Sequence, residues 1–379
     1  MIDFFEVMLH LFYILFAIEM VIAIVAYTNV AEYPFMAVKQ RTINYLSDRR
    51  LHIYLLLSLG AIFLFHAFRN PLTLDDIPYY VDAFYESKDA SWNRVYDMGY
   101  ATLKTEVGFA LVIKAISSMF SFDQALFILT SAFILGAVYF SISRYSPIWW
   151  LSIFVFITDS FPQSLFILRS FVAIGLFLYA FPSILNRKLI VFLLISLAAF
   201  TMHMSAIIFL PVYFLYGVKN KLYLSVALGV IAVFTIVSFY ILIPLMVEYI
   251  LPEYAYYLLS AEKSEGISWK MPAFMSTLML FRLFVMRKHF FEEGINRLLS
   301  IIMVLAATIY VAGMDFGMTS RMAMFYSNIT FLIIPNTLQY IKSSSWQFAC
   351  AIVYILFNSY FFFMSTSDVL WASYQLLEI

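Results

Sequence analysis

Residues 124–143 read QALFILTSAFILGAVYFSIS, a stretch that carries no charged side chain anywhere along its length. A helix needs about 20 mostly apolar residues to cross a bilayer, because each residue advances it by ~1.5 Å through a hydrocarbon core ~30 Å thick. The apolar residues here run together, without the alternation that marks a membrane β-strand. This stretch therefore predicts a membrane-spanning α-helix.

The composition extends this prediction to the whole chain. Of the 379 residues, 64% are hydrophobic and only 12% are charged, and the mean hydropathy is +0.89. A soluble domain has about 45–50% apolar and about 25% charged residues, so this chain has too few charges to cover a water-exposed surface. The formal net charge of zero gives no electrostatic reason to expect a nucleic-acid partner. The single cysteine, Cys350, excludes an intramolecular disulfide and a thiolate metal cage, and we expect no cofactor.

Further apolar runs predict an all-α fold, a polytopic bundle of about 10–13 transmembrane helices. The predicted spans lie at about 4–27, 51–68, 124–143, 147–160, 165–185, 189–203, 205–217, 222–247, 272–287, 299–314, 322–341 and 346–365. The stretch 107–121 is shorter and carries Lys114, so we predict a re-entrant or interfacial helix there. Residues 1–379 are taken as a single transmembrane domain.

The distribution of basic residues orients the bundle, because lysine and arginine accumulate in the cytoplasmic loops of membrane proteins. If 107–121 does not cross the membrane, more than half of the 23 basic residues fall on one face, in short loops with few acids. They are Lys39, Arg41, Arg49, Arg50, Arg144, Arg187, Lys188, Lys219, Lys221, Arg287, Lys288, Arg297 and Lys342. This face is predicted to be cytoplasmic, which leaves both termini and two large loops, 69–106 and 248–271, outside.

Polar residues that are costly to keep near a bilayer gather on the predicted outer face. They are Arg69, Asp75, Asp76, Tyr79, Tyr80, Glu106, Arg169, His203, Asp315 and Arg321. Arg169 and Arg321 are the strongest functional candidates, because each lies in an apolar run where a charge costs about 2.5–3.5 kcal/mol at mid-bilayer. The alternative for either is a structural ion pair with Glu106, Asp159 or Asp315. Arg282, also in an apolar run, is expected to face an acidic neighbour or to reach the inner surface.

These residue types suit chemistry on a phosphorylated lipid carrier. Arginine stays charged and binds phosphate through a planar fork of N–H donors, so converging arginines suit a lipid-linked diphosphate. A nearby carboxylate or imidazole can deprotonate a sugar hydroxyl that attacks an anomeric carbon. Tyr79 and Tyr80 can stack on sugar rings or belong to the ordinary aromatic belt. For His203 the alternative is a buried neutral histidine bonded to the backbone, and the Asp75–Asp76 pair is compatible with a hard cation, although we expect no metal.

A series of short motifs occupies the chain between about residues 60 and 330. They are FRNPLTLDDIPYY (68–80), EVGF (106–109), RYSP (144–147), LRSFVAIG (168–175), NRK (186–188), HMSAIIFLP (203–211) and SRMAMFY (320–326). In this order and spacing they resemble the EpsG family of bacterial membrane proteins, which belong with the Wzy-type polysaccharide polymerases. Family members usually carry glycine just before the aspartate and glutamine after the intramembrane arginine, where this chain has Thr73-Leu74 and Ser170.

The resemblance implies a GT-C-like helical fold and a glycosyltransferase in the bacterial inner (cytoplasmic) membrane, with its active site facing the periplasm or exterior. Such an enzyme transfers a growing glycan from undecaprenyl diphosphate to a lipid-linked repeat unit by inverting glycosyl transfer. The product would be capsule, exopolysaccharide or O-antigen. The partners implied are the undecaprenyl-diphosphate-linked donor and acceptor, the lipid bilayer and a chain-length regulator.

Carried onto this chain, the resemblance places diphosphate recognition at Arg69, Arg169 and Arg321. The catalytic base would be Glu106, Asp75 or His203. The residues expected to help bind the diphosphate or the glycan are Asp76, Tyr79, Tyr80 and Asp315. Two other functions stay open. One is a membrane acyltransferase that modifies glycans, and the other is a lipid-linked oligosaccharide flippase or transporter, which would show paired broken helices and an inverted repeat.

Overall fold

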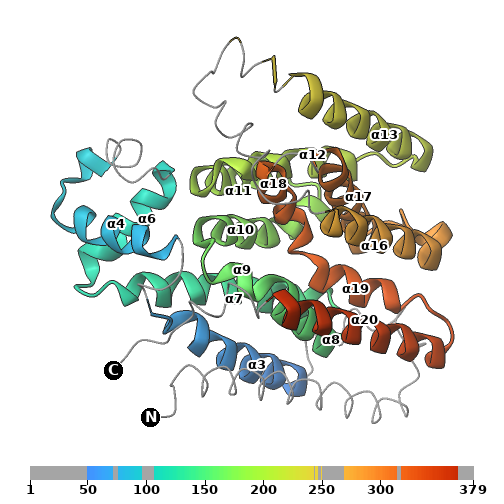
Figure 1. Cartoon of the computed structure of the whole chain (residues 1–379), viewed down its shortest axis with the longest axis horizontal. Helices are drawn as coiled ribbons and strands as arrows, with labels where there is room; N and C mark the ends of the chain where they lie inside the picture. The colour runs from blue at the N-terminus through green and yellow to red at the C-terminus, as the bar shows by residue number, and fades with distance from the viewer. Residues whose placement is uncertain are drawn as a thin grey trace. The chain divides into compact units, whose positions relative to one another are not determined.

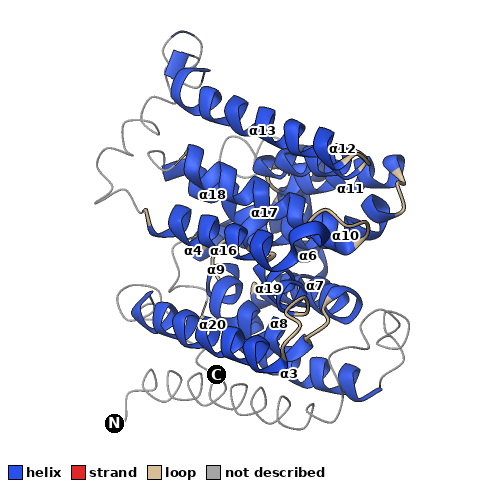
Figure 2. Cartoon of the chain, turned by 90° about the vertical axis from the view of Figure 1, so that its right-hand side faces the viewer, coloured by secondary structure: helices blue, strands red, loops and turns tan. Residues whose placement is uncertain are grey.

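The computed structural model describes residues 49–70, 76–95, 106–242, 269–313 and 317–365, together with residues 244, 245 and 249. Every regular element in these ranges is a helix (Figures 1 and 2). The structure therefore supports the predicted all-α fold. The first predicted span and most of the loop at 248–271 lie outside the described residues.

The helices follow the apolar runs of the sequence. The described part of each predicted span from 51–68 onward lies mostly in one helix or in successive helical pieces. The α-helices are α3 (Arg49–Ala67), α4 (Ile77–Asp89), α6 (Val107–Met119), α7 (Gln124–Tyr145), α8 (Trp149–Val155), α9 (Phe161–Ser164), α10 (Leu168–Leu185), α11 (Leu189–Met202), α12 (Leu210–Tyr216), α13 (Lys221–Val237), α16 (Lys270–Met286), α17 (Ile295–Ala312), α18 (Gly317–Ser327), α19 (Thr330–Leu338) and α20 (Ser344–Ser365). The shorter 3₁₀ and π-helical pieces are η3 (Trp92–Arg94), η4 (Phe156–Ser160), η5 (Met204–Phe209), η6 (Ser238–Leu242) and η9 (Arg287–His289).

Several of these helices are suited to a membrane. Among the described residues, α7, α10, the continuous segment of α13 with η6, and α17 are each long and apolar enough to cross one alone. These four helices support a polytopic membrane protein. The full number of spans and the single domain over 1–379 stay predictions.

The two predicted spans that are short for a bilayer are composite. The span at 147–160 begins with α8 and continues through the π-helical turn η4 into α9. The span at 205–217 consists of the 3₁₀ piece η5 followed by α12. In each of these spans the regular α-helical hydrogen bonding is therefore interrupted. Such interruptions are frequent at functional sites.

Contacts divide the chain into two compact units. Of the described residues, the first unit contains those within 1–179, 197–204 and 334–379, and the second contains those within 180–196 and 205–333. In the first unit α3 packs along α7, α4 packs against α6, and α20 packs against η4. In the second unit α17 is the common partner of α12, α13, α16 and α18.

The predicted outer loop 69–106 is itself partly helical, because it contains α4. The buried Lys114 of α6 binds the end of α4. Its Nζ donates to the carbonyl oxygens of Ser87 at 2.8 Å and Lys88 at 3.2 Å. These carbonyls lie in the last turn of α4, where unpaired acceptors and the helix dipole favour a cation. A lysine that is costly inside an apolar helix therefore serves to hold α4 against α6.

Arg282 does not reach the surface as expected. Its side chain is fully buried in the second unit. The guanidinium donates to Ser300 Oγ at 3.1 Å and to the carbonyl oxygens of Asn296 at 3.1 Å and Ile333 at 3.3 Å. Because these acceptors lie on α17 and α19, the arginine joins both helices to α16 instead of extending towards the inner face.

The length of α6 generates a prediction about topology. With 13 residues it is about 20 Å long, which is short of the ~30 Å hydrocarbon core, so both of its ends are expected on the same side. In a chain with Cys350→Ser, single cysteines at the exposed positions Ser91 and Ser121 should both react with a membrane-impermeant maleimide added outside intact spheroplasts. Lys188→Cys should react only after permeabilisation. Labelling of Ser91→Cys and Ser121→Cys from opposite sides would show that α6 crosses.

Candidate active site

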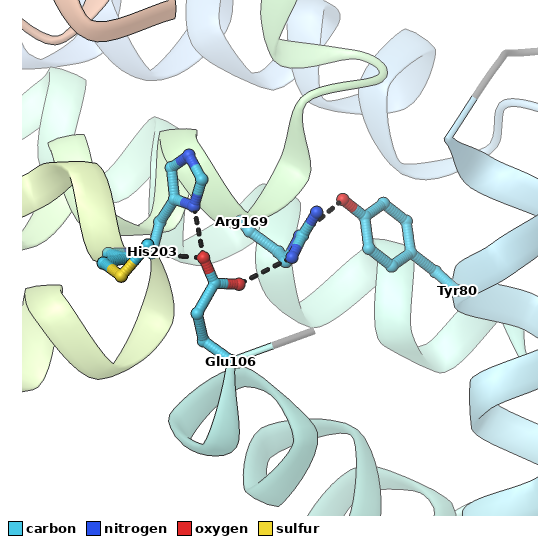
Figure 3. A network of polar contacts seen from close by, with 5 residues as sticks. Tyr80, Glu106, Arg169 and His203 are labelled. Atoms are coloured by element: carbon cyan, nitrogen blue, oxygen red, sulfur yellow. Dashed lines mark hydrogen bonds and ion pairs between the residues drawn. The ribbon is translucent and has the colours of Figure 1, made fainter. Parts of the chain in front are cut away.

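Four side chains from distant parts of the first unit meet in one polar cluster, formed by Tyr80 of α4, Glu106 at the start of α6, Arg169 of α10 and His203 at the end of α11 (Figure 3). Figure 3 shows the Glu106 carboxylate between the imidazole on one side and the guanidinium on the other, with Tyr80 beyond the guanidinium. We call these four residues the Glu106 cluster.

Glu106 is the centre of the cluster because both of its oxygens are engaged. Oε2 accepts from Arg169 Nη1 at 2.6 Å, and Oε1 lies 2.6 Å from His203 Nδ1. Oε1 also accepts from the backbone N–H of Met204 at 3.1 Å. Glu106 occupies the N-cap position of α6 with an extended backbone, so the positive end of the helix dipole also favours its negative charge.

Arg169 is held from two sides. It is the second residue of α10, and besides its ion pair with Glu106 its Nε donates to the Tyr80 hydroxyl at 3.3 Å. The Tyr80 ring is buried and packs edge-on against Phe109 of α6, with the ring centroids 5.4 Å apart. Helices α4 and α6 therefore fix the orientation of an arginine that comes from a third helix.

The carboxylate, guanidinium and imidazole side chains of the cluster are partly buried. The exposed fraction of the side chain is 23% for Glu106, 23% for Arg169 and 21% for His203. Partial burial strengthens the interactions between these charges, because fewer water dipoles screen them. The remaining exposure leaves part of each side chain accessible from outside the protein.

The electrostatics of the cluster favour the ionised carboxylate. Burial opposes ionisation of Glu106, but the hydrogen bond from His203 and the charges of Arg169 and His203 outweigh it and lower the pKa of Glu106 from 4.5 to about 2. A carboxylate with so low a pKa is a weak base. Its suitable role is to hold and orient the guanidinium of Arg169 and the imidazole of His203.

The imidazole is the better candidate for proton transfer. With Nδ1 directed at Glu106, the other ring nitrogen, Nε2, points away from the carboxylate (Figure 3). A carboxylate on one ring nitrogen fixes the ring orientation and tautomer, and it stabilises the imidazolium that forms when the other nitrogen takes a proton. The arrangement can therefore hold a proton at Nδ1 and accept one at Nε2.

The structure brings together only part of the predicted site. Glu106, Arg169, His203 and Tyr80 meet, and the carboxylate that pairs with Arg169 is Glu106, one of the three acids expected as partners. His203 contacts this carboxylate, so a histidine bonded only to the backbone is not what the fold contains.

The described hydrogen bonds and ion pairs of the Glu106 cluster do not include the other predicted residues. Asp75 and Asp315 lie outside the described residues. Asp76 is the N-cap residue of α4 and makes no side-chain cap there, while Tyr79 is 69% exposed on the same helix. Arg321 is exposed on α18 and belongs to the second unit.

Arg69 is fully buried, unlike Arg169. Its guanidinium lies over the Phe127 ring, 4.6 Å from the centroid, and it donates to the backbone carbonyl of His66. Its Nη1 also lies 3.0 Å from Nδ1 of the buried His66. These contacts place the arginine within the packing of α3 and α7, and its predicted role in diphosphate recognition stays a prediction.

One donor of the site was not predicted from the sequence. The backbone N–H of Met204 reaches Glu106 because α11 ends at Met202 and the chain continues as a 3₁₀ piece. The stretch AFTMHMSAIIF shows a helix break around His203, which was the signal available. The sequence does not show that the Met204 N–H at this break points towards Glu106, almost a hundred positions earlier. Tertiary packing alone decides this.

A model of the EpsG family matches residues 52–376 of the chain, which includes the whole Glu106 cluster. This match confirms the resemblance shown by the motifs and supports a polysaccharide-polymerase type of function in a bacterial membrane, with lipid-linked oligosaccharides as substrates. No curated protein and no solved structure matches the chain.

The lowered pKa of Glu106 predicts how acid affects stability. A carboxyl whose pKa falls from 4.5 to about 2 on folding stabilises the folded state by about 3 kcal/mol above pH 4.5 and loses this contribution as the pH falls towards 2. Glu106→Gln should therefore lower the Tm at pH 7, and its Tm should depend less on pH between 4.5 and 2.5 than that of the wild type. Thermal unfolding in detergent, followed by intrinsic fluorescence, measures both.

The control for this experiment is Glu293→Gln, since the side chain of Glu293 is 75% exposed. This variant should retain the acid dependence of the wild type. If Glu106→Gln has the same Tm profile as the wild type, the Glu106 ion pair does not contribute to stability.

Proposed function

The chain belongs to the EpsG family, and from this premise we propose that it is a polysaccharide polymerase whose transfer reaction takes place at the Glu106 cluster. It transfers a growing glycan from undecaprenyl diphosphate to the next lipid-linked repeat unit, at the outer face of the cytoplasmic membrane. The single observation that carries the proposal is the placement of one carboxylate between an arginine and a histidine, all partly exposed.

His203 is the catalytic base in this proposal. Its Nε2 takes the proton of an acceptor sugar hydroxyl as the hydroxyl oxygen attacks the anomeric carbon of the donor glycan. The Glu106 carboxylate at Nδ1 stabilises the imidazolium that results. Glu106 was also a candidate base, but its lowered pKa suits it to orient the imidazole instead.

Arg169 stabilises the leaving group. As the new glycosidic bond forms, the bond between the anomeric carbon and the diphosphate oxygen breaks, and the diphosphate leaves with the electron pair. A guanidinium is permanently charged and matches phosphate oxygens geometrically. Because Tyr80 and Glu106 orient Arg169 beforehand, little reorganisation is needed when negative charge develops. Inversion follows from direct attack opposite the leaving diphosphate.

The exposed face of α4 provides a surface for the glycan. Tyr79 is 69% exposed and Tyr85 is 47% exposed, and Asp82 and Glu86 are exposed beside them. An aromatic ring covers the apolar face of a pyranose, and carboxylates accept hydrogen bonds from its hydroxyls. The opposite side of the helix carries Tyr80, which contacts Arg169, so α4 connects this surface to the Glu106 cluster.

Kinetics of variants at two positions, His203 and Arg169, test the reaction. Purified protein in nanodiscs is given a synthetic undecaprenyl-diphosphate repeat unit, and products are resolved as a ladder on a gel. His203→Asn retains a donor that can reach Glu106 but has no atom in the place of Nε2, so kcat should fall by about 10²–10⁴-fold. Arg169→Ala should lower kcat and raise KM for the lipid-linked donor, with Arg169→Lys intermediate because it restores charge without the fork.

Arg144→Ala is the matched control, since Arg144 is exposed and stacks over the Phe140 ring at 4.3 Å. It should retain the activity of the wild type. A wild type that forms no ladder from its authentic substrate would overturn the proposed reaction. If both His203→Asn and Arg169→Ala still form a ladder, the proposed reaction is supported, but it does not take place at the Glu106 cluster.

The glycan surface on α4 makes a separate prediction. Tyr79→Ala should raise KM for the acceptor about 2–13-fold, which corresponds to the loss of one stacking contact of about 0.5–1.5 kcal/mol, and should leave kcat unchanged. Tyr223→Ala is the control, because Tyr223 is 67% exposed on α13 in the second unit. An unchanged acceptor KM for Tyr79→Ala would show that this face does not bind the glycan.

A further inference from the structure

Helix α6 begins unusually close to the end of α11. The contact is between Gly108, the second residue of α6, and Thr201 in the last turn of α11. A Cβ at position 108 would meet Thr201 Oγ1, and it would lie 2.6 Å from Thr201 Cβ and 2.7 Å from the Thr201 carbonyl oxygen. Ordinary van der Waals contact begins near 3.4 Å, so only glycine fits at this position without movement of the helices.

The crowded atoms cannot simply turn aside. Thr201 Oγ1 donates to the carbonyl oxygen of Ala198 at 2.8 Å, which fixes the hydroxyl against its own helix. One of the three close atoms is a backbone oxygen, whose position changes only when α11 itself moves. A side chain at 108 would therefore separate the two helices by about 1 Å.

This close approach lies next to the reacting groups. Glu106 precedes Gly108 by two residues, and His203 follows Thr201 by two residues. The 2.6 Å contact between Glu106 Oε1 and His203 Nδ1, and the 3.1 Å bond from the Met204 N–H, both cross the same gap between α6 and α11. Their lengths depend directly on how closely the two helix ends approach.

We infer that Gly108 is a positioning residue for glycosyl transfer: its missing side chain lets α6 start close enough to α11 for Glu106 to hold His203. The inference rests on the proposed function of the Glu106 cluster. Intrinsic helix propensity alone favours alanine over glycine in a helix by about 1 kcal/mol. Glycine at this position therefore serves a packing requirement that outweighs helix propensity.

The geometry predicts a selective defect. A displacement of about 1 Å takes Glu106 out of good hydrogen-bonding distance from His203, and a misplacement of this size can cost about 10²-fold in rate. Arg169 comes from α10 on a long side chain that can follow the carboxylate. Gly108→Ala should therefore lower kcat by about 100-fold while KM for the lipid-linked donor changes less than about 3-fold.

The experiment compares Gly108→Ala with Gly60→Ala and Gly229→Ala in the nanodisc assay. Apart from its chain neighbours and its own helix, neither Gly60 nor Gly229 has a described atom within 4 Å of an added Cβ, so both controls should match the wild type. The decisive variant is Gly108→Ala combined with Glu106→Gln. If Gly108 acts through Glu106, the double variant should be no slower than Glu106→Gln alone. Wild-type kinetics for Gly108→Ala, or losses that multiply in the double variant, would overturn the inference.

A second pair of variants applies if Gly108→Ala does not fold. Thr201→Ile enlarges the facing side chain and should cause the same kcat loss, whereas Thr201→Val keeps the shape and should remain active. Wild-type kinetics for Thr201→Ile would count against the inference.

A readout without substrate separates this inference from the proposed function. Among the described residues, the charged and titratable groups that face Glu106 are Arg169, His203 and Tyr80. Gly108→Ala should separate the carboxylate from His203. Its Tm should then depend less on pH between 4.5 and 2.5, as for Glu106→Gln. If the wild type forms no ladder but the Tm of Gly108→Ala does depend less on pH, the proposed function fails. The role of Gly108 in positioning Glu106 against His203 is then still supported. An unchanged acid profile overturns the positioning role whether or not a ladder forms.

Discussion

The Glu106 carboxylate is the interaction on which the described site depends, because it contacts a guanidinium from α10, an imidazole at the end of α11 and a backbone N–H at the start of η5. In a partly dehydrated setting a charge is tolerated only when it is paired and hydrogen-bonded. Each member of the cluster therefore requires the others, and four segments distant in sequence are held in one geometry. The same geometry gives the imidazole a fixed orientation and the arginine a fixed direction.

Arginines in apolar helices have different functions in this fold, and their surroundings distinguish them. Arg282 is fully buried and donates to neutral oxygens of α17 and α19, so it joins helices. Arg69 is fully buried over an aromatic ring. Arg169 has a carboxylate partner and remains partly exposed. A charge in an apolar run is thus a useful indication of importance, while the type of partner and the exposure indicate what it does.

Irregular helix ends place the polar groups of the site. Glu106 precedes α6, Arg169 is at the start of α10, and His203 lies where α11 gives way to a 3₁₀ piece. At helix termini backbone groups lack partners within the helix, so they can bind side chains or substrate. The Met204 N–H is one such group, because it donates to Glu106. A backbone carbonyl at the C-terminal end of α4 is another, because it accepts a hydrogen bond from Lys114.

The sequence by itself determined the all-helical membrane fold, because its long apolar runs lack the alternation of a membrane β-strand and therefore span a bilayer as helices. Arg169, Glu106 and His203 were also predicted as candidates, since each is a polar residue in an apolar setting. Only the tertiary structure decided that Glu106 joins the other two while Arg69 is buried elsewhere. It also showed how closely Gly108 approaches Thr201, which the EVGF motif did not indicate. Pairings between residues some hundred positions apart depend on how helices pack, and hydropathy and residue type contain no information about that.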